Sequence, residues 1–141
     1  MAKFIVTVNY LAKVIITEAD REITIPSSVT KIGYKAFAEC TSLTSITIPN
    51  SVTEIDDNAF YGCTSLTSIE IPSSVKRIGD LAFWECKNLT SITLPEAFAN
   101  KTPEELRFMG LDPDKVEITI RGEDGKTHLY EGPTHKGRKG K

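Results

Sequence analysis

The sequence lacks the features that mark several large classes of protein. Its 17 Lys and Arg residues against 19 Asp and Glu leave a net charge of -2, so nothing indicates a surface built to bind polyanions. No apolar run approaches the roughly 18 to 20 residues that cross a bilayer. The longest early run, Phe4 to Val8, is too short for a secretory signal peptide. These absences predict a soluble chain and favour a cytoplasmic location, with an extracellular one as the alternative.

Cysteine is scarce, and the motifs of catalysis are missing. The chain has three cysteines, an odd number, which together with the missing export signal favours thiols over disulfides. Structural zinc needs four ligands, and both His residues, His128 and His135, lie far along the chain from the cysteines. No Gly-rich phosphate loop or catalytic triad motif occurs. We therefore expect no enzyme activity, no metal site and no cofactor.

What the sequence does contain is a repeat of 23 residues. Residues 23–45, 46–68 and 69–91 are three copies, and a fourth begins at Ile92 and then departs. Twelve of the 23 positions are identical in all three copies, and most of them are apolar. Self-similarity at such a period indicates a solenoid in which each copy forms one rung and stacks on the next.

One rung divides into a strand, a corner and a return segment. In the second copy, the alternation in Ile46-Thr-Ile48 predicts a half-buried strand with Ser45 and Thr47 facing outward. The prolines at 26, 49, 72 and 95 are expected to turn the chain out of this strand. The spacing of apolar residues from Ser51 to Cys63 predicts a short helical or 3₁₀ return.

The ends of the solenoid require caps, because an end rung exposes its core. Residues 1–22 are expected to form a β-hairpin cap, with strands at 4–8 and 14–17 flanking a connection at 9–13. Residues 23–95 hold the repeats. Residues 96–132 are expected to form the second cap, with a helix starting at Pro103 after Thr102, a strand at 116–120 and a closing hairpin to 127–130. Residues 133–141 form a basic tail.

The rung can be written L-x-x-I-x-I-P-x-x-V-x-x-I-x-x-x-A-F-x-x-C, and it resembles the BspA-like, or Treponema-type, leucine-rich repeat. The resemblance covers roughly residues 20–95 and includes an A-F-x-x-C box in every copy. It implies a short α/β leucine-rich repeat solenoid that binds protein. It also implies a bacterial setting, because the family includes adhesins on bacterial surfaces. The small size, the acidic charge and the missing export signal leave a phage product as a further possibility.

Two surfaces of the predicted solenoid are candidates for partner binding. The first is the concave strand face, whose outward side chains could offer a partner many hydrogen bonds at little entropic cost; it comprises Ser45, Thr47, Ser68, Glu70, Ser91 and Thr93. Threonine also simply suits an exposed strand. The second is a flank formed by Tyr61, Leu81 and Trp84, since Tyr and Trp are frequent interface anchors. Alternatively, these aromatic side chains cover Phe98 or Leu106 of the cap.

Two charged features have a plainer interpretation. Asp56 and Asp57 are adjacent carboxylates, but we expect them to cap the return helix or to be solvated. The tail adds positive charge through Lys136, Arg138, Lys139 and Lys141, whereas residues 1–134 carry a net charge of -6. This tail could contact a polyanion through counterion release, or it could be a solvated end.

The sequence leaves three hypotheses for function. The first is a protein-interaction module, an adaptor or inhibitor that binds a protein through the solenoid surface. The second is a secreted or cell-surface adhesin, and the third is a nucleic-acid-associated protein that uses the basic tail. An unpaired hairpin edge would also offer a route to pairing with a second copy of the chain.

Overall fold

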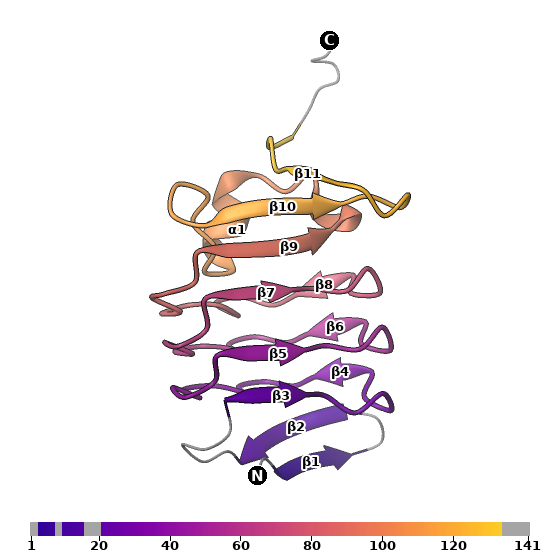
Figure 1. Ribbon diagram of the computed structural model, residues 1–141, viewed down its shortest axis with the longest axis vertical. Coiled ribbons are helices and arrows are strands. Elements are labelled where there is room, and N and C mark those ends of the chain that lie inside the picture. Colours follow the sequence, from indigo (N-terminus) through magenta and orange to yellow (C-terminus); the bar gives the residue numbers. More distant parts are fainter. Residues whose placement is uncertain (1–2, 8–9, 16–20, 134–141) are drawn as a thin grey trace.

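The computed structural model describes residues 3–7, 10–15 and 21–133, and within them the chain forms a stack of rungs (Figure 1). Each rung starts with a strand, turns a corner, adds a second, two-residue strand and closes with a turn. The first strands are β3 Glu22–Thr24, β5 Ser45–Thr47, β7 Ser68–Glu70 and β9 Ser91–Pro95. The second strands are β4 Lys31–Ile32, β6 Glu54–Ile55 and β8 Arg77–Ile78. The predicted solenoid of 23-residue rungs is therefore confirmed.

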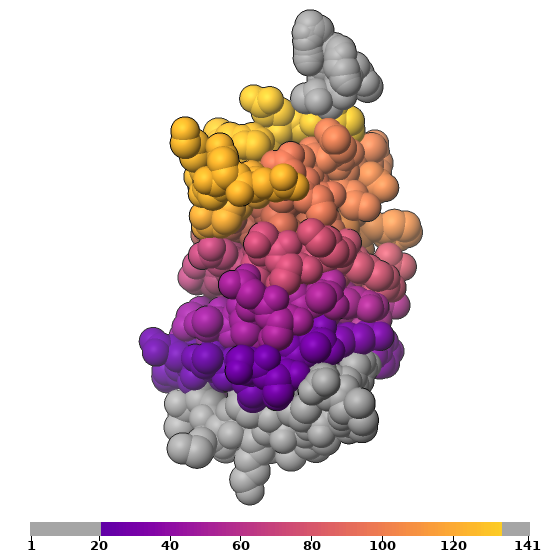
Figure 2. Space-filling view, turned by 90° about the vertical axis from the view of Figure 1, so that its right-hand side faces the viewer, coloured from indigo at the N-terminus to yellow at the C-terminus, as the bar shows by residue number. Residues whose placement is uncertain are grey.

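Most strands of neighbouring rungs pair in parallel, each residue beside its equivalent in the next copy. Ile23 pairs with Ile46, Ile69 pairs with Ile92, and Ile55 pairs with both Ile32 and Ile78. Strand β5 also lies against β7. The space-filling view shows the rungs as bands that follow one another along the long axis (Figure 2). One sequence position thus becomes one straight row of side chains.

The core is built from these rows. Phe37, Phe60 and Phe83 are almost completely buried, and their rings stack with centroids 5.3 and 5.4 Å apart and interplanar angles of 6° and 5°. The rows of Ile, Val, Ala and Leu at the other identical positions are buried beside them. Because every rung contributes the same shapes, the core is continuous from one rung to the next.

The predicted helical return is wrong: the return segment is a series of turns. Lys35, Asn58 and Leu81 have left-handed backbone angles with φ of 57°, and a second left-handed residue, Glu39, Gly62 or Glu85, follows four positions later in each rung. A right-handed helix cannot include such residues. In the first two rungs the N–H groups of these residues instead donate to carbonyls of the next rung, as in Lys35 to Asp57 at 3.2 Å. Pairing between rungs therefore replaces pairing within a helix.

The N-terminal end carries a hairpin, with β1 Lys3–Thr7 antiparallel to β2 Tyr10–Ile15. Strand β2 also pairs in parallel with β4, which joins the hairpin to the first rung. The second strand begins earlier than the predicted connection at 9–13 allows, because Tyr10, Leu11 and Lys13 pair with residues of β1. The other predicted strand residues, Val8, Ile16 and Thr17, lie outside the described residues.

At the other end, the chain leaves the 23-residue register. Strand β9 ends at Pro95, as expected, but it is longer than the other first strands, because Pro95 itself pairs with Arg121 of β10 Glu117–Arg121. Ser91 pairs with Glu117, three residues later than the period would place a partner. The C-terminal cap also contains η1 Glu96–Phe98, α1 Pro103–Phe108 and β11 Thr127–Leu129, the last antiparallel to β10.

Helix α1 begins with a complete capping box. The Thr102 hydroxyl accepts from the Glu105 N–H at 3.1 Å, and the Glu105 carboxylate accepts from the Thr102 N–H at 2.8 Å. These bonds hold the pKa of Glu105 below its usual range, because they favour the charged carboxylate. The start of the helix is thus fixed locally, and its buried Leu106 anchors it on the core.

Candidate functional site

The strand face presents the row of polar side chains that the sequence indicates. Its side chains alternate with buried isoleucines along each strand: Ser45, Thr47, Ser68 and Glu70 are exposed, and Ser91 and Thr93 are half-buried. We call these six residues the strand face. They occupy successive parallel strands stacked in Figure 1, so their side chains form two rows that run across the strands. Neighbours within a row are about one strand spacing apart, and the two rows are two residues apart along each strand.

One member of the strand face is already paired. The Glu70 carboxylate lies 2.6 Å from Arg121 Nη2, and Arg121 reaches it from β10 across the intervening β9. Sequence reasoning missed Arg121, because the cap is out of register with the repeat and no 23-residue spacing connects the two residues. Arg121 lies between two shallow cavities of about 470 and 480 Å³, of which one is lined by Thr47, Glu70 and Ser73.

A cleft opens where the last full rung meets the C-terminal cap. In the repeats, the N–H of Phe37 donates to Ala59 and that of Phe60 to Ala82 in the next rung. The Phe83 N–H donates to Met109 of the cap, 2.8 Å away, so the cap begins by imitating a fourth rung. At Gly110 the chain stops following the path of a rung and turns away from the stack, which leaves a cavity of about 470 Å³.

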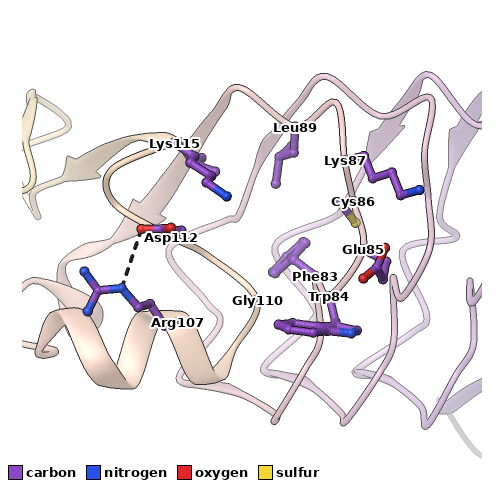
Figure 3. Close-up of a pocket in the computed structure, with 11 residues that line it drawn as sticks. Phe83, Trp84, Glu85, Cys86, Lys87, Leu89, Arg107, Gly110, Asp112 and Lys115 are labelled. Carbon is purple, nitrogen blue, oxygen red and sulfur yellow. Dashed lines mark ion pairs between the residues drawn. The ribbon is translucent and has the colours of Figure 1, made fainter.

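This cleft has an apolar floor and charged sides (Figure 3). The close-up shows Trp84 and Gly110 along one side and Lys115 and Leu89 along the other, with Phe83 and Cys86 between them. Gly110 allows the close approach: a Cβ there would lie 2.5 Å from the Phe83 carbonyl carbon. Charged side chains at the ends include Glu85, Lys87 and the Arg107–Asp112 ion pair, whose atoms are 3.5 Å apart.

Of the three residues in the predicted flank, Tyr61, Leu81 and Trp84, only Trp84 lines this cleft. Trp84 lines it and keeps 45% of its surface exposed. Tyr61 and Leu81 are half-buried and are not among the lining residues. Phe98 and Leu106 are buried within the cap, while Trp84 borders Gly110. Sequence analysis missed Phe108, which is 68% exposed and whose carbonyl accepts from the Leu81 N–H at 2.7 Å.

The three cysteines form a row of free thiols at the inner side of the turns. The sulfurs of Cys63 and Cys86 each lie 3.1 Å from the carbonyl oxygen of a phenylalanine in the preceding rung, Phe37 and Phe60 respectively. Burial raises the pKa of Cys40 to about 11. The interaction with the Cys86 thiol, followed by burial, raises the pKa of Cys63. Within residues 21–133, no group of three or more potential ligands is arranged to hold a metal ion.

Asp56 and Asp57 order the turns, although the helix that they were expected to cap is absent from the return segment. The Asp56 carboxylate accepts from the Asp57 N–H at 2.7 Å, and the Asp57 carboxylate accepts from the Asp80 N–H of the next rung at 2.8 Å. Beside them, Glu54 lies 3.5 Å from Lys31 and 2.7 Å from Arg77. These acids therefore link neighbouring rungs. Sequence analysis did not note that Lys31, Glu54 and Arg77 alternate in charge at one position of the repeat.

Two further predictions concern the C-terminal part of the chain. His128 is exposed on β11, where it pairs with Ile120 of β10. The tail residues Lys136, Arg138, Lys139 and Lys141 lie outside the described residues. No helix in the described part of the chain is long and apolar enough to span a membrane.

Comparison with known proteins gives consistent results. A leucine-rich repeat protein from Bacteroides ovatus is 39% identical with a TM-score of 0.58, covering 67% of this chain and 23% of its own length. A leucine-rich cell surface protein from Faecalibacterium prausnitzii is 31% identical with a TM-score of 0.52, covering 83% and 29%. The Treponema pallidum leucine-rich repeat protein is 29% identical with a TM-score of 0.50, covering 73% and 57%.

The chain thus spans less than a third of the length of the first two proteins. A search of curated sequences finds no match. The pattern of the BspA type leucine-rich repeat region matches residues 18–118 with 6 copies. The chain therefore belongs to the BspA-type leucine-rich repeat family, as its A-F-x-x-C boxes and its 23-residue rungs indicate.

Proposed function

We propose that this chain is a non-enzymatic protein-binding module, an adaptor or inhibitor, that docks a protein partner on its strand face. The observation that carries the proposal is the strand face itself. Its side chains point away from the core, and apart from Glu70, which pairs with Arg121, they are hydroxyl groups that the rungs hold in two regular rows. Rigid rows of hydroxyl groups bind with little loss of side-chain entropy.

The test is to block the strand face without disturbing the core. Thr47→Arg with Ser68→Arg places two long charged side chains on exposed positions. Partners are first captured from a nuclease-treated lysate of the native cell, with the full chain and a version ending at Gly132 as baits. We expect the arginine pair to abolish binding of the captured protein and to leave the thermal midpoint unchanged.

The matched control places arginines on exposed threonines outside the strand face, at Thr41 and Thr53. This control should bind like the unaltered chain. Unaltered binding by the strand-face variant would exclude that face. Binding that disappears only with the version ending at Gly132 would instead assign the contact to the tail, with a steep salt dependence if the ligand is a nucleic acid.

A second candidate function is a secreted or cell-surface adhesin. One observation favours it: the Faecalibacterium prausnitzii protein of similar structure is described as a leucine-rich cell surface protein. Cell fractionation combined with thiol titration separates the two candidates. An adhesin should appear in the surface or secreted fraction, whereas an intracellular adaptor should appear in the cytosol with all three thiols free.

A further inference from the structure

At the cleft beside Trp84, one of the hydrogen bonds that join neighbouring rungs is missing. In the first two turns, the Glu39 N–H donates to Tyr61 at 2.6 Å and the Gly62 N–H donates to Trp84 at 2.8 Å. The equivalent N–H in the third turn belongs to Glu85. It has no hydrogen-bond partner among the described residues, because the cap turns away at Gly110. The cleft therefore holds a backbone donor that the repeat pattern would pair.

The charges around the cleft are unequal. Arg107 is neutralised by Asp112 and Asp114, with N–O distances of 3.5 and 3.6 Å. Lys87 and Lys115 are exposed and line the cleft, and neither has an ion-pair partner within residues 21–133. Glu85 is the one unpaired acid among the lining residues. The cationic side chains available to a ligand thus outnumber the acidic ones.

The apolar lining of the cleft includes the aromatic side chains of Phe83 and Trp84. Trp84 presents nearly half of its surface, and Phe108 is the most exposed large apolar residue of the described chain. Phe108 is joined to the same rung through its hydrogen bond with Leu81, three residues before Trp84. An exposed aromatic side chain that lines a concave site, as Trp84 does, is a typical anchor for a protein ligand.

We propose that this cleft is a second binding site, separate from the strand face, for an acidic peptide segment of a partner that carries an aromatic or aliphatic anchor. The anchor packs on Trp84 over the floor formed by Phe83. Carboxylates of the segment pair with Lys87 and Lys115, and one of its carbonyls accepts from the Glu85 N–H. The segment thereby supplies the contacts that a complete fourth turn would make. The proposal rests on the proposed function only in that its ligand is a protein.

The experiment selects the ligand from a random peptide library displayed on phage, with the full chain as bait. Counter-selection uses the variant Lys87→Glu with Lys115→Glu. We expect enrichment of peptides that combine Asp or Glu with an aromatic or aliphatic side chain. A synthetic consensus peptide should alter the fluorescence of Trp84, which is the only tryptophan of the chain, and should bind the variant about tenfold more weakly.

The matched control is Lys35→Glu with Lys126→Glu, which changes net charge equally at exposed sites outside the cleft. It should bind the consensus peptide within about twofold of the unaltered chain. No enrichment, peptides without acidic side chains, or equal binding to both lysine variants would overturn the proposal. Because the strand face is intact in every variant, capture of the lysate partner tests the proposed function independently.

Discussion

The repeats and the C-terminal cap solve the same packing problem in opposite ways. In the repeats, identical residues lie above one another, as the stacked rings of Phe37, Phe60 and Phe83 show. In the cap the 23-residue register is lost, by three residues between Ser91 and Glu117 and by four between Phe83 and Met109. Unlike residues therefore meet, such as Gly110 and Phe83 or Arg121 and Glu70. Repetition thus gives a continuous core, whereas the departure from repetition creates the cleft. The cleft and the ion pair between Arg121 and Glu70 both occur where the 23-residue repeat ends.

The largest effect should come from interrupting the repeated core. Phe60→Ala removes the central ring of the stack and leaves a cavity, so we expect a loss of about 3 to 5 kcal/mol in the free energy of unfolding, measured by urea denaturation. The control is Phe108→Ala in the cap, which removes an exposed ring and should cost less than about 0.5 kcal/mol. Equal losses would show that the stacked row does not dominate stability.

The next effect should come from the contact between cap and last rung. Gly110→Ala adds a Cβ against the Phe83 backbone at a φ of +92°, so we expect a loss of about 2 to 4 kcal/mol and an altered Trp84 fluorescence. Gly125→Ala is the matched control, since φ is +83° there but a Cβ meets nothing within 4 Å. It should cost about 1 kcal/mol. Similar losses at both sites would refute close docking of the cap.

Thiol reactivity should distinguish the rung beside the cleft from the rungs inside the stack. Cys86 is half-buried and lines the cleft, whereas Cys63 is fully buried and the pKa of Cys40 is raised to about 11. At about pH 8, a thiol reagent should label Cys86 at least about tenfold faster than the other two. Mass spectrometry of the labelled peptides identifies each site. Fast labelling of Cys63 would mean that the middle rung opens readily.

The smallest effect should come from ion pairs that join strands. Arg121→Gln and Glu70→Gln, combined in a double-mutant cycle, should give a coupling of about 0.5 to 1 kcal/mol that weakens as salt is added, because both side chains are partly exposed. The same cycle on Arg77 and Glu54 compares a pair within the repeats, whose atoms are 2.7 Å apart. If the Arg77–Glu54 pair shows a coupling and the Arg121–Glu70 pair shows none, the ion pair of Arg121 does not stabilise the cap.

Sequence analysis predicted the repeated part well, because the same pattern of apolar and polar residues occurs in three copies. The inward Phe and Ile positions and the outward Ser45 and Thr47 all lie where the alternation places them. The return segment was predicted wrongly as helical, since its apolar spacing suits both a helix and a turn. The decisive property is the left-handed backbone at Lys35, Asn58 and Leu81, three unlike side chains that carry no common sequence signal.

The sequence alone therefore determined the period, the rows of the core and the polar strand face, because each depends on residues at a fixed spacing. Only the tertiary structure decided the cleft, the ion pair between Glu70 and Arg121, and the exposure of Trp84 and Phe108. These features depend on how the cap leaves the 23-residue register as it settles on the last rung. They arise from contacts between residues far apart in the sequence, which no fixed spacing in the chain encodes.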